Sequence, residues 1–286
     1  LERGEEVCAV YCAPDSGSRT DPLKAYAQEQ GLPLFQPKTY KDESVVAQMK
    51  DLGADLCVMA YVTLMVPESA LNAPRLGSIQ YHPSLLPLHK GPSSINWPII
   101  FGETKTGLSI FWPDDGLDTG PILLQKDVAI APDDTLGSLY FNHLFPMGVA
   151  SMCEAVDLVR EGTAPCIEQD PSGGTYEGWC RAEDVKIDWH QPVDSVYNMI
   201  RGANPQPGAW TTLSGQKLTV LDSTRAEVIE ATPGTVTSID ETGMTIAGDG
   251  GSILISRVKT ESGAKLSAAD FPGQLTVSVG DVLGAS

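Results

Sequence analysis

The chain has 286 residues, of which 42% are hydrophobic and 20% charged, and its formal net charge is −18. These values are typical of a globular protein with room for two modest domains. Nucleic-acid binders normally carry a basic patch, so this acidic balance disfavours bulk binding of tRNA or DNA. Because the sequence has no apolar run of about eighteen residues and no signal-peptide pattern at its start, we expect a cytoplasmic protein that does not contact a membrane.

The first third of the chain alternates short apolar runs with polar stretches of helical period. These patterns predict strands at 7–13, 32–35 and 54–61, and helices at 22–30 and 42–53. Asp21 is the expected N-cap of the first helix, with Pro22 at its first position, and Gly53 is the expected C-cap of the second. Such βαβ units favour a parallel sheet covered on both faces. The chain opens at what resembles the end of a helix, so we expect the opening strand and most of its helix to be missing.

The middle of the chain continues this pattern. We expect strands at 78–82, 106–112 and 123–130, a helix at 93–103, and a long helix at 135–162 interrupted by Pro146. A polar, glycine-rich linker follows near residue 165, and the turn expected between the first strand and helix spans 14–22. From about residue 207 short strands alternate with turns, which is typical of a small β-barrel. The predicted domains are therefore 1–179 and 180–286.

Two polar residues stand where an α/β sheet usually binds its ligand. His82 is the last residue of the strand at 78–82, and Asp118 lies in a loop after the strand at 106–112. A plain alternative is that His82 forms a hydrogen bond in the core and that the aspartates of DDGLDTG are turn formers. This loop lacks the register and the closing Glu of a calcium loop. The six cysteines show no C-x-x-C pair, and we expect no metal and no disulfide framework.

The motifs HPSLLP (82–87) and GLDTG (116–120) together resemble the folate-dependent formyltransferase family. With SSINW, TYEG, KIDWHQP and IRGANPQPGAW, the chain is most similar to the N-terminal hydrolase domain of 10-formyltetrahydrofolate dehydrogenase. The resemblance implies a Rossmann-like catalytic domain followed by a small OB-like β-barrel, and it implies that His82 and Asp118 are catalytic. Transferase members carry Asn two residues before the His, where this chain has Gln80. That departure favours hydrolysis over transfer to an amine.

The resemblance also implies a site for 10-formyltetrahydrofolate, which is the expected substrate. The implied folate-binding residues come from two segments, namely Tyr61, Val62, Leu64 and Met65, and Asp114, Asp115 and Gly116. Val62, Leu64 and Met65 are equally well explained as core residues. The Leu86–Pro87 bond is a candidate cis peptide, and His89 and Lys90 are expected to be solvated.

The function that these residues favour is hydrolysis of 10-formyltetrahydrofolate to tetrahydrofolate and formate. Water attack on the formyl group creates an oxyanion, which a protonated His82 would stabilise before it protonates the leaving nitrogen. Gln80 would donate a further hydrogen bond to the oxyanion. Two alternatives stay open: transfer of the formyl group to methionyl-tRNA or an amino sugar, and a non-catalytic folate-binding module. The dehydrogenase and carrier domains of the related enzyme are absent from this sequence.

Overall fold

The computed structural model describes residues 1–15 and 21–285, so the turn expected over 14–22 lies largely outside the described residues. The chain divides into two compact units. The first comprises Leu1–His82, Ser109–Gln125 and Gly148–Gly173, and the second comprises Pro83–Leu108, Lys126–Met147 and Gly174–Ser286. The domain boundary expected at residue 180 stays a prediction. None of the helices in the described ranges is long and apolar enough to cross a membrane.

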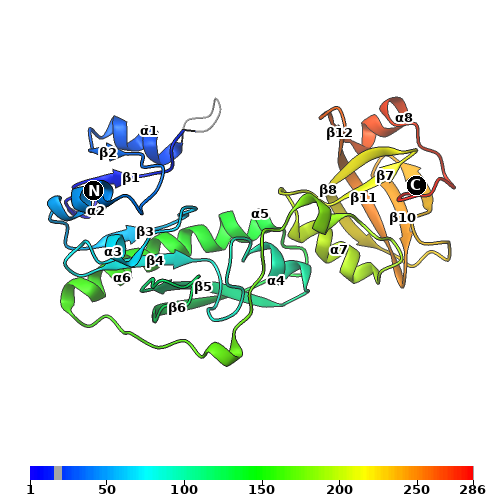
Figure 1. The fold of residues 1–286 in the computed structure, drawn as a ribbon. Coiled ribbons are helices and arrows are strands. Elements are labelled where there is room, and N and C mark those ends of the chain that lie inside the picture. The colour runs from blue at the N-terminus through cyan, green and yellow to red at the C-terminus, as the bar shows by residue number, and fades with distance from the viewer. Residues whose placement is uncertain (16–20, 286) are drawn as a thin grey trace. The chain divides into compact units, whose positions relative to one another are not determined.

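The first part of the chain forms short strands and helices in the predicted order (Figure 1). They are β1 (Val10–Tyr11), α1 (Pro22–Glu29), β2 (Leu34–Phe35), α2 (Glu43–Asp51), β3 (Cys57–Met59), α3 (Glu68–Leu71) and β4 (Ser78–His82). Asp21 caps α1 by accepting from the N–H of Leu23, and Pro22 is the first helical residue. Gly53 follows α2 with a φ of 62°, as expected of a C-cap glycine.

Two separate sheets hold these strands. β1 pairs in parallel with β2, and a four-stranded sheet has the order β3-β4-β5-β6, where β5 is Lys105–Phe111 and β6 is Ile122–Ala129. β3 and β4 are parallel, as predicted, but β4 and β5 are antiparallel, so the prediction of a parallel sheet was wrong for β5. A helix was predicted between these two strands, yet the chain re-enters the sheet in the opposite direction. The missing opening strand stays a prediction.

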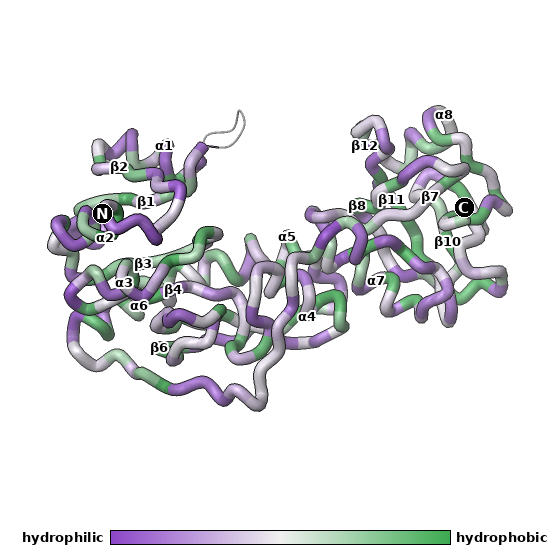
Figure 2. Tube along the Cα trace, in the orientation of Figure 1, coloured by the Kyte–Doolittle hydropathy of each residue, from purple (hydrophilic) through white to green (hydrophobic). Residues whose placement is uncertain are grey.

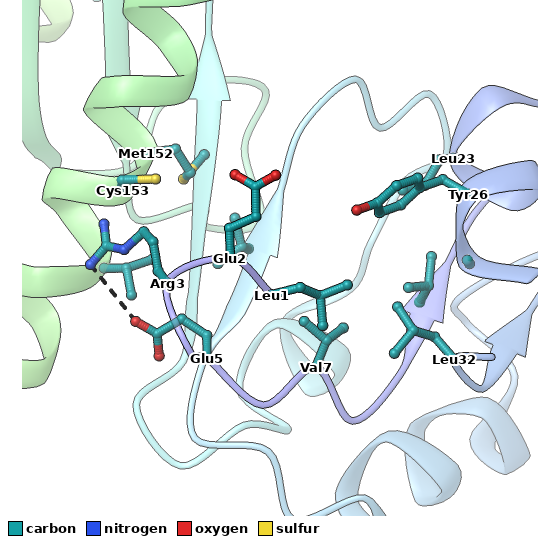
Figure 3. Close-up of a pocket in the computed structure, with 14 residues that line it drawn as sticks. Leu1, Glu2, Arg3, Glu5, Val7, Leu23, Tyr26, Leu32, Met152 and Cys153 are labelled. Atoms are coloured by element: carbon teal, nitrogen blue, oxygen red, sulfur yellow. Dashed lines mark ion pairs between the residues drawn. The ribbon is translucent and has the colours of Figure 1, made fainter. Parts of the chain in front are cut away.

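An apolar pocket of about 480 Å³ lies beside β1 and β3 (Figure 3). Its lining comes from the first residues of the chain, from β1, α1 and β3, and from α6, including Val10, Tyr26, Val58 and Met152. None of the predicted site residues lines this pocket. The pocket is therefore distinct from the candidate site.

The long predicted helix is divided in three. α5 (Leu136–Leu139) leads into a π-helical turn (Tyr140–Leu144) and then into α6 (Phe145–Glu161). Pro146 has no N–H for the preceding turn and its ring would clash with the carbonyl four residues back, so the wider turn accommodates it. α6 packs on β4 at Gly148, where a Cβ would lie only 2.7 Å from the Tyr81 ring.

The C-terminal part of the second unit is an antiparallel sheet with the strand order β7-β8-β11-β10-β9, to which β12 adds by pairing with β11. The strands are β7 (Trp210–Leu213), β8 (Gln216–Ala226), β9 (Val236–Asp240), β10 (Gly243–Gly248), β11 (Gly251–Thr260) and β12 (Lys265–Ser267). Figure 2 shows apolar residues along β11, whose buried side chains join a core with α7 (Val193–Gly202). Closure of this sheet into a barrel stays a prediction.

Short helices complete the fold. They are α4 (Asn96–Ile100), α8 (Phe271–Gln274) and the 3-10 helices Pro171–Gly173, Ala182–Val185 and Ala268–Asp270. Asn96 of α4 donates its side-chain amide to the carbonyls of Gly202 (2.9 Å) and Gln206 (3.0 Å), which ties α4 to the end of α7. The Leu86–Pro87 peptide is cis, as predicted.

Candidate active site

β4 supplies the first two residues of the site. Gln80 and His82 are two positions apart, so they lie on the same face of the strand. Gln80 is opposite Phe111 of β5, and His82 is opposite Ser109. The proline after His82 cannot donate to a sheet ladder, so the strand ends there. His82 is thus a buried side chain at the carboxyl end of a central strand.

Asp118 comes from the loop between β5 and β6, which is closed by its own hydrogen bonds. The carboxylate of Asp114 accepts from the N–H of Gly116 (3.0 Å) and from the hydroxyl of Thr119 (2.7 Å). Aspartate side chains commonly form turns in this way. The N–H of Trp112 donates to the carbonyl of Pro121 at 2.9 Å and joins the two ends of the loop. Asp114, which was predicted to bind folate, therefore has a structural role in the loop.

The two glycines of GLDTG are required by close contacts. A Cβ on Gly116 would lie 1.9 Å from the Thr119 hydroxyl oxygen, and one on Gly120 would lie 1.8 Å from the Trp112 carbonyl oxygen. Asp118 between them has a φ of 55°, in the left-handed region that few residues other than glycine adopt. Such a conformation costs about 1–3 kcal/mol and persists only where the surroundings enforce it.

The loop and β4 bring the predicted catalytic residues together. Nδ1 of His82 lies 3.6 Å from Oδ2 of Asp118, and both side chains are only 7% exposed. The distance is within that of an ion pair and longer than a hydrogen bond. Shielded from water, an imidazolium and a carboxylate interact more strongly than at a surface. The pair can therefore stabilise a developing negative charge and transfer a proton.

The segment after β3 begins at the same edge of the sheet as His82, because β3 and β4 are parallel and Met59 is opposite Gln80. Tyr61 is 91% exposed and has a φ of 54°, and Met65 is also exposed. Leu64 packs against the hydrophobic cluster that contains Tyr40 and Val46. This packing agrees with the alternative interpretation of Leu64 as a core residue. Tyr61 and Met65 are thus the exposed residues of this predicted folate-binding segment.

Two features of the structure escaped the sequence interpretation. The side-chain amide of Gln169 donates to the carbonyls of Asp118 and Gly120, although Gln169 lies 51 residues beyond Asp118. The expectation that His89 is solvated was wrong, since the side chain is buried and has carboxylates at both ring nitrogens. Its Nε2 lies 2.9 Å from Glu103 and its Nδ1 lies 3.1 Å from Glu177. These two carboxylates offset the cost of burial.

The described residues contain no group of three or more His, Cys, Asp or Glu side chains that could hold a metal ion.

Comparison with known proteins gives the family. Residues 8–152 match the formyl transferase family model, and residues 180–274 match the model of the formyl transferase C-terminal domain. The chain is 41% identical to the cytosolic 10-formyltetrahydrofolate dehydrogenase of Mus musculus, over 94% of this chain and 32% of that protein. It thus spans about a third of that relative's length. The methionyl-tRNA formyltransferase of Geobacter metallireducens is 36% identical, over 95% of this chain and 88% of that protein.

Solved structures share the fold. The crystal structure of HypX from Aquifex aeolicus in complex with tetrahydrofolic acid superposes with a TM-score of 0.69 at 17% identity, covering 89% of this chain and 44% of that one. An N-formyltransferase from Helicobacter canadensis, in complex with folinic acid and dTDP-3-aminofucose, gives a TM-score of 0.60 at 20% identity, covering 84% of each chain. The chain matches the models of both formyl transferase domains, and it has a buried His–Asp pair formed by HPSLLP and GLDTG. The chain therefore belongs to the formyl transferase family of enzymes.

Proposed function

We propose that this chain hydrolyses 10-formyltetrahydrofolate to tetrahydrofolate and formate. The observation that carries the proposal is the buried His82–Asp118 pair, with Gln80 on the same face of β4. The similarity to 10-formyltetrahydrofolate dehydrogenases supports the choice of substrate. The folate would lie against the exposed Tyr61 and Met65, with Val62 and Leu64 behind them, and against the loop at Asp114, Asp115 and Gly116.

The reaction needs one proton removed and one supplied. Asp118 accepts a proton from the attacking water as the water oxygen bonds to the formyl carbon. His82, as the imidazolium, stabilises the resulting oxyanion, and the amide of Gln80 adds a hydrogen bond to it. His82 then protonates N10 as the carbon–nitrogen bond breaks, which releases tetrahydrofolate and formic acid. The formic acid ionises to formate in water, and transfer of the proton from Asp118 to His82 restores the starting pair. Catalytic hydrogen bonds commonly shorten once substrate is bound, which fits the 3.6 Å separation of the pair.

A second candidate is transfer of the formyl group to an amine. It is favoured by the methionyl-tRNA formyltransferase relative, which this chain covers over 88% of its length. In that reaction an amine nitrogen replaces the water oxygen, and Asp118 takes the proton from the amine. The net charge of −18 disfavours a tRNA acceptor, because proteins that bind tRNA normally neutralise part of its phosphate charge with a basic patch. This objection does not apply to an amino-sugar acceptor.

One assay separates these candidates. The protein is incubated with 10-formyltetrahydrofolate, alone and with methionyl-tRNA or amino sugars, while tetrahydrofolate and formate are measured. We expect release without any acceptor, and a loss of about 10²–10⁴-fold in kcat for His82→Asn and Asp118→Asn. His143→Asn and Asp51→Asn are matched controls, since both side chains are exposed. Turnover only with an amine would replace hydrolysis by transfer, and binding without turnover would leave a folate-binding module.

A further inference from the structure

Gln169 contacts the backbone of the loop that carries Asp118. Its Nε2 lies 2.9 Å from the carbonyl oxygen of Asp118 and 2.7 Å from that of Gly120. The residue comes from the polar segment after α6, which is fixed beside β6 because Ile122 and Ile167 exchange backbone hydrogen bonds. Gln169 therefore contacts the loop from a segment that lies outside the GLDTG motif.

The orientation of the Gln169 amide follows from its neighbours. Both contacted atoms are carbonyl oxygens, which only accept, so the nitrogen of the amide must face them and use both of its hydrogens. Its Oε1 is buried and receives no hydrogen bond from any described residue. Burial of an oxygen without a hydrogen bond destabilises a fold. The benefit of glutamine at this position therefore comes from its two N–H donors.

The two contacted carbonyls belong to Asp118, where the backbone is strained, and to Gly120, two residues later. Asp118 has a φ of 55°, and Gly120 lies against the carbonyl of Trp112, so this backbone has one close-packed arrangement. Asp114 makes the hydrogen bonds to Gly116 and Thr119 within the loop, and Trp112 and Pro121 join its two ends. Gln169 binds the backbone at Asp118 from outside the loop.

We propose that Gln169 is a positioning residue, whose amide holds the Asp118 backbone in the left-handed conformation that directs the carboxylate to His82. The catalytic part of this proposal rests on the proposed function, because it assigns Gln169 to the same reaction. A displacement of about 1 Å in a catalytic group can reduce a rate about 100-fold. Loss of the amide should therefore reduce kcat, while the KM for folate, which is set by other residues, changes little.

Three variants test this role. Gln169→Met keeps the length of the side chain but has no donor, and we expect kcat to fall about 100-fold with KM within about threefold of wild type. Gln169→Glu places a carboxylate against two carbonyls at neutral pH, and its protonated form at low pH can donate to one of them. The kcat of Gln169→Glu relative to that of Gln169→Met should therefore rise as the pH is lowered from 8 to 5. Gln48→Glu is the matched control, because Gln48 accepts from Tyr11 and a carboxylate also accepts.

A readout independent of turnover accompanies the kinetics. In protein with ¹⁵N-labelled histidine, the His82 ring signals are assigned by their loss in His82→Asn. The signals should shift in Gln169→Met towards their position in Asp118→Asn, with thermal unfolding recorded to show that each variant is folded. Unchanged kcat and unchanged His82 signals in folded Gln169→Met would overturn the proposal. An inactive wild type would refute the proposed function instead, while the His82 signals would still decide the role of Gln169.

Discussion

The substitution Gly120→Ala tests how tightly the loop holds the catalytic carboxylate. Gly120 has no positive φ, so alanine is compatible with its backbone, and the only obstacle is space. The added Cβ would lie 1.8 Å from the carbonyl oxygen of Trp112, whereas real Cβ atoms essentially never approach closer than 3.0 Å. The two backbones must therefore separate by about 1.2 Å, two residues away from Asp118.

A movement of that size has a defined kinetic cost. Displacing a catalytic group by about 1 Å can reduce the rate about 100-fold, which corresponds to about 2.7 kcal/mol of transition-state stabilisation. We expect Gly120→Ala to lower kcat by about this factor while the protein stays folded, because the clash is confined to one loop. The assay is formate release from 10-formyltetrahydrofolate, with the melting temperature measured in parallel.

Gly178→Ala is the control, since a Cβ there would meet nothing within 4 Å. A Gly120→Ala enzyme with kcat within about threefold of wild type would refute the reasoning, because it would show that the loop can move without displacing Asp118. A large fall in melting temperature accompanied by unchanged kcat of the folded fraction would refute it equally.

Three further predictions follow from buried groups. His89→Ala should lower the free energy of unfolding in urea by about 2–4 kcal/mol, since it leaves the largely buried Glu177 without its imidazole; Glu177→Gln should lower it by less. Burial raises the pKa of the Cys180 thiol to about 11, so at pH 8 a thiol reagent should modify the exposed Cys166 and reach Cys180 only on unfolding; equal rates would contradict this. Burial also raises the pKa of Tyr197 to about 12, so the unfolded state loses this proton first and stability should fall as the pH rises from 10 to 12, a fall that Tyr197→Phe should reduce.

Local signals predicted most elements of the first unit. The N-cap at Asp21, the proline at the start of α1 and the glycine after α2 each have a short-range physical cause that a sequence displays directly. The direction of β5 was predicted wrongly, because the strand pattern is the same for either direction of pairing. α7 was not predicted, although Val193, Val196, Tyr197 and Ile200 recur at the spacing of a helix.

The site was predictable to the extent that short sequence motifs contain its residues. His82 and Asp118 lie within two short motifs, and the structure places their ring and carboxylate 3.6 Å apart. Gln169 and Glu177, one of the two partners of His89, were not predictable, because their contacts join residues 49 to 88 positions apart. A lone glutamine in a polar stretch has no periodicity or spacing that marks it. Only the folded chain shows which carbonyls it meets.

The left-handed backbone at Asp118 also limits how this position can vary among sequences. Asparagine, aspartate and glycine are the residues that adopt this conformation readily, and β-branched residues are excluded. Replacement of Asp118 by asparagine or glycine should therefore add little backbone strain, whereas valine or isoleucine should add the most. A carboxylate can thus be lost at this position while the loop keeps its conformation, which separates the proton acceptor proposed for the reaction from the fold that carries it.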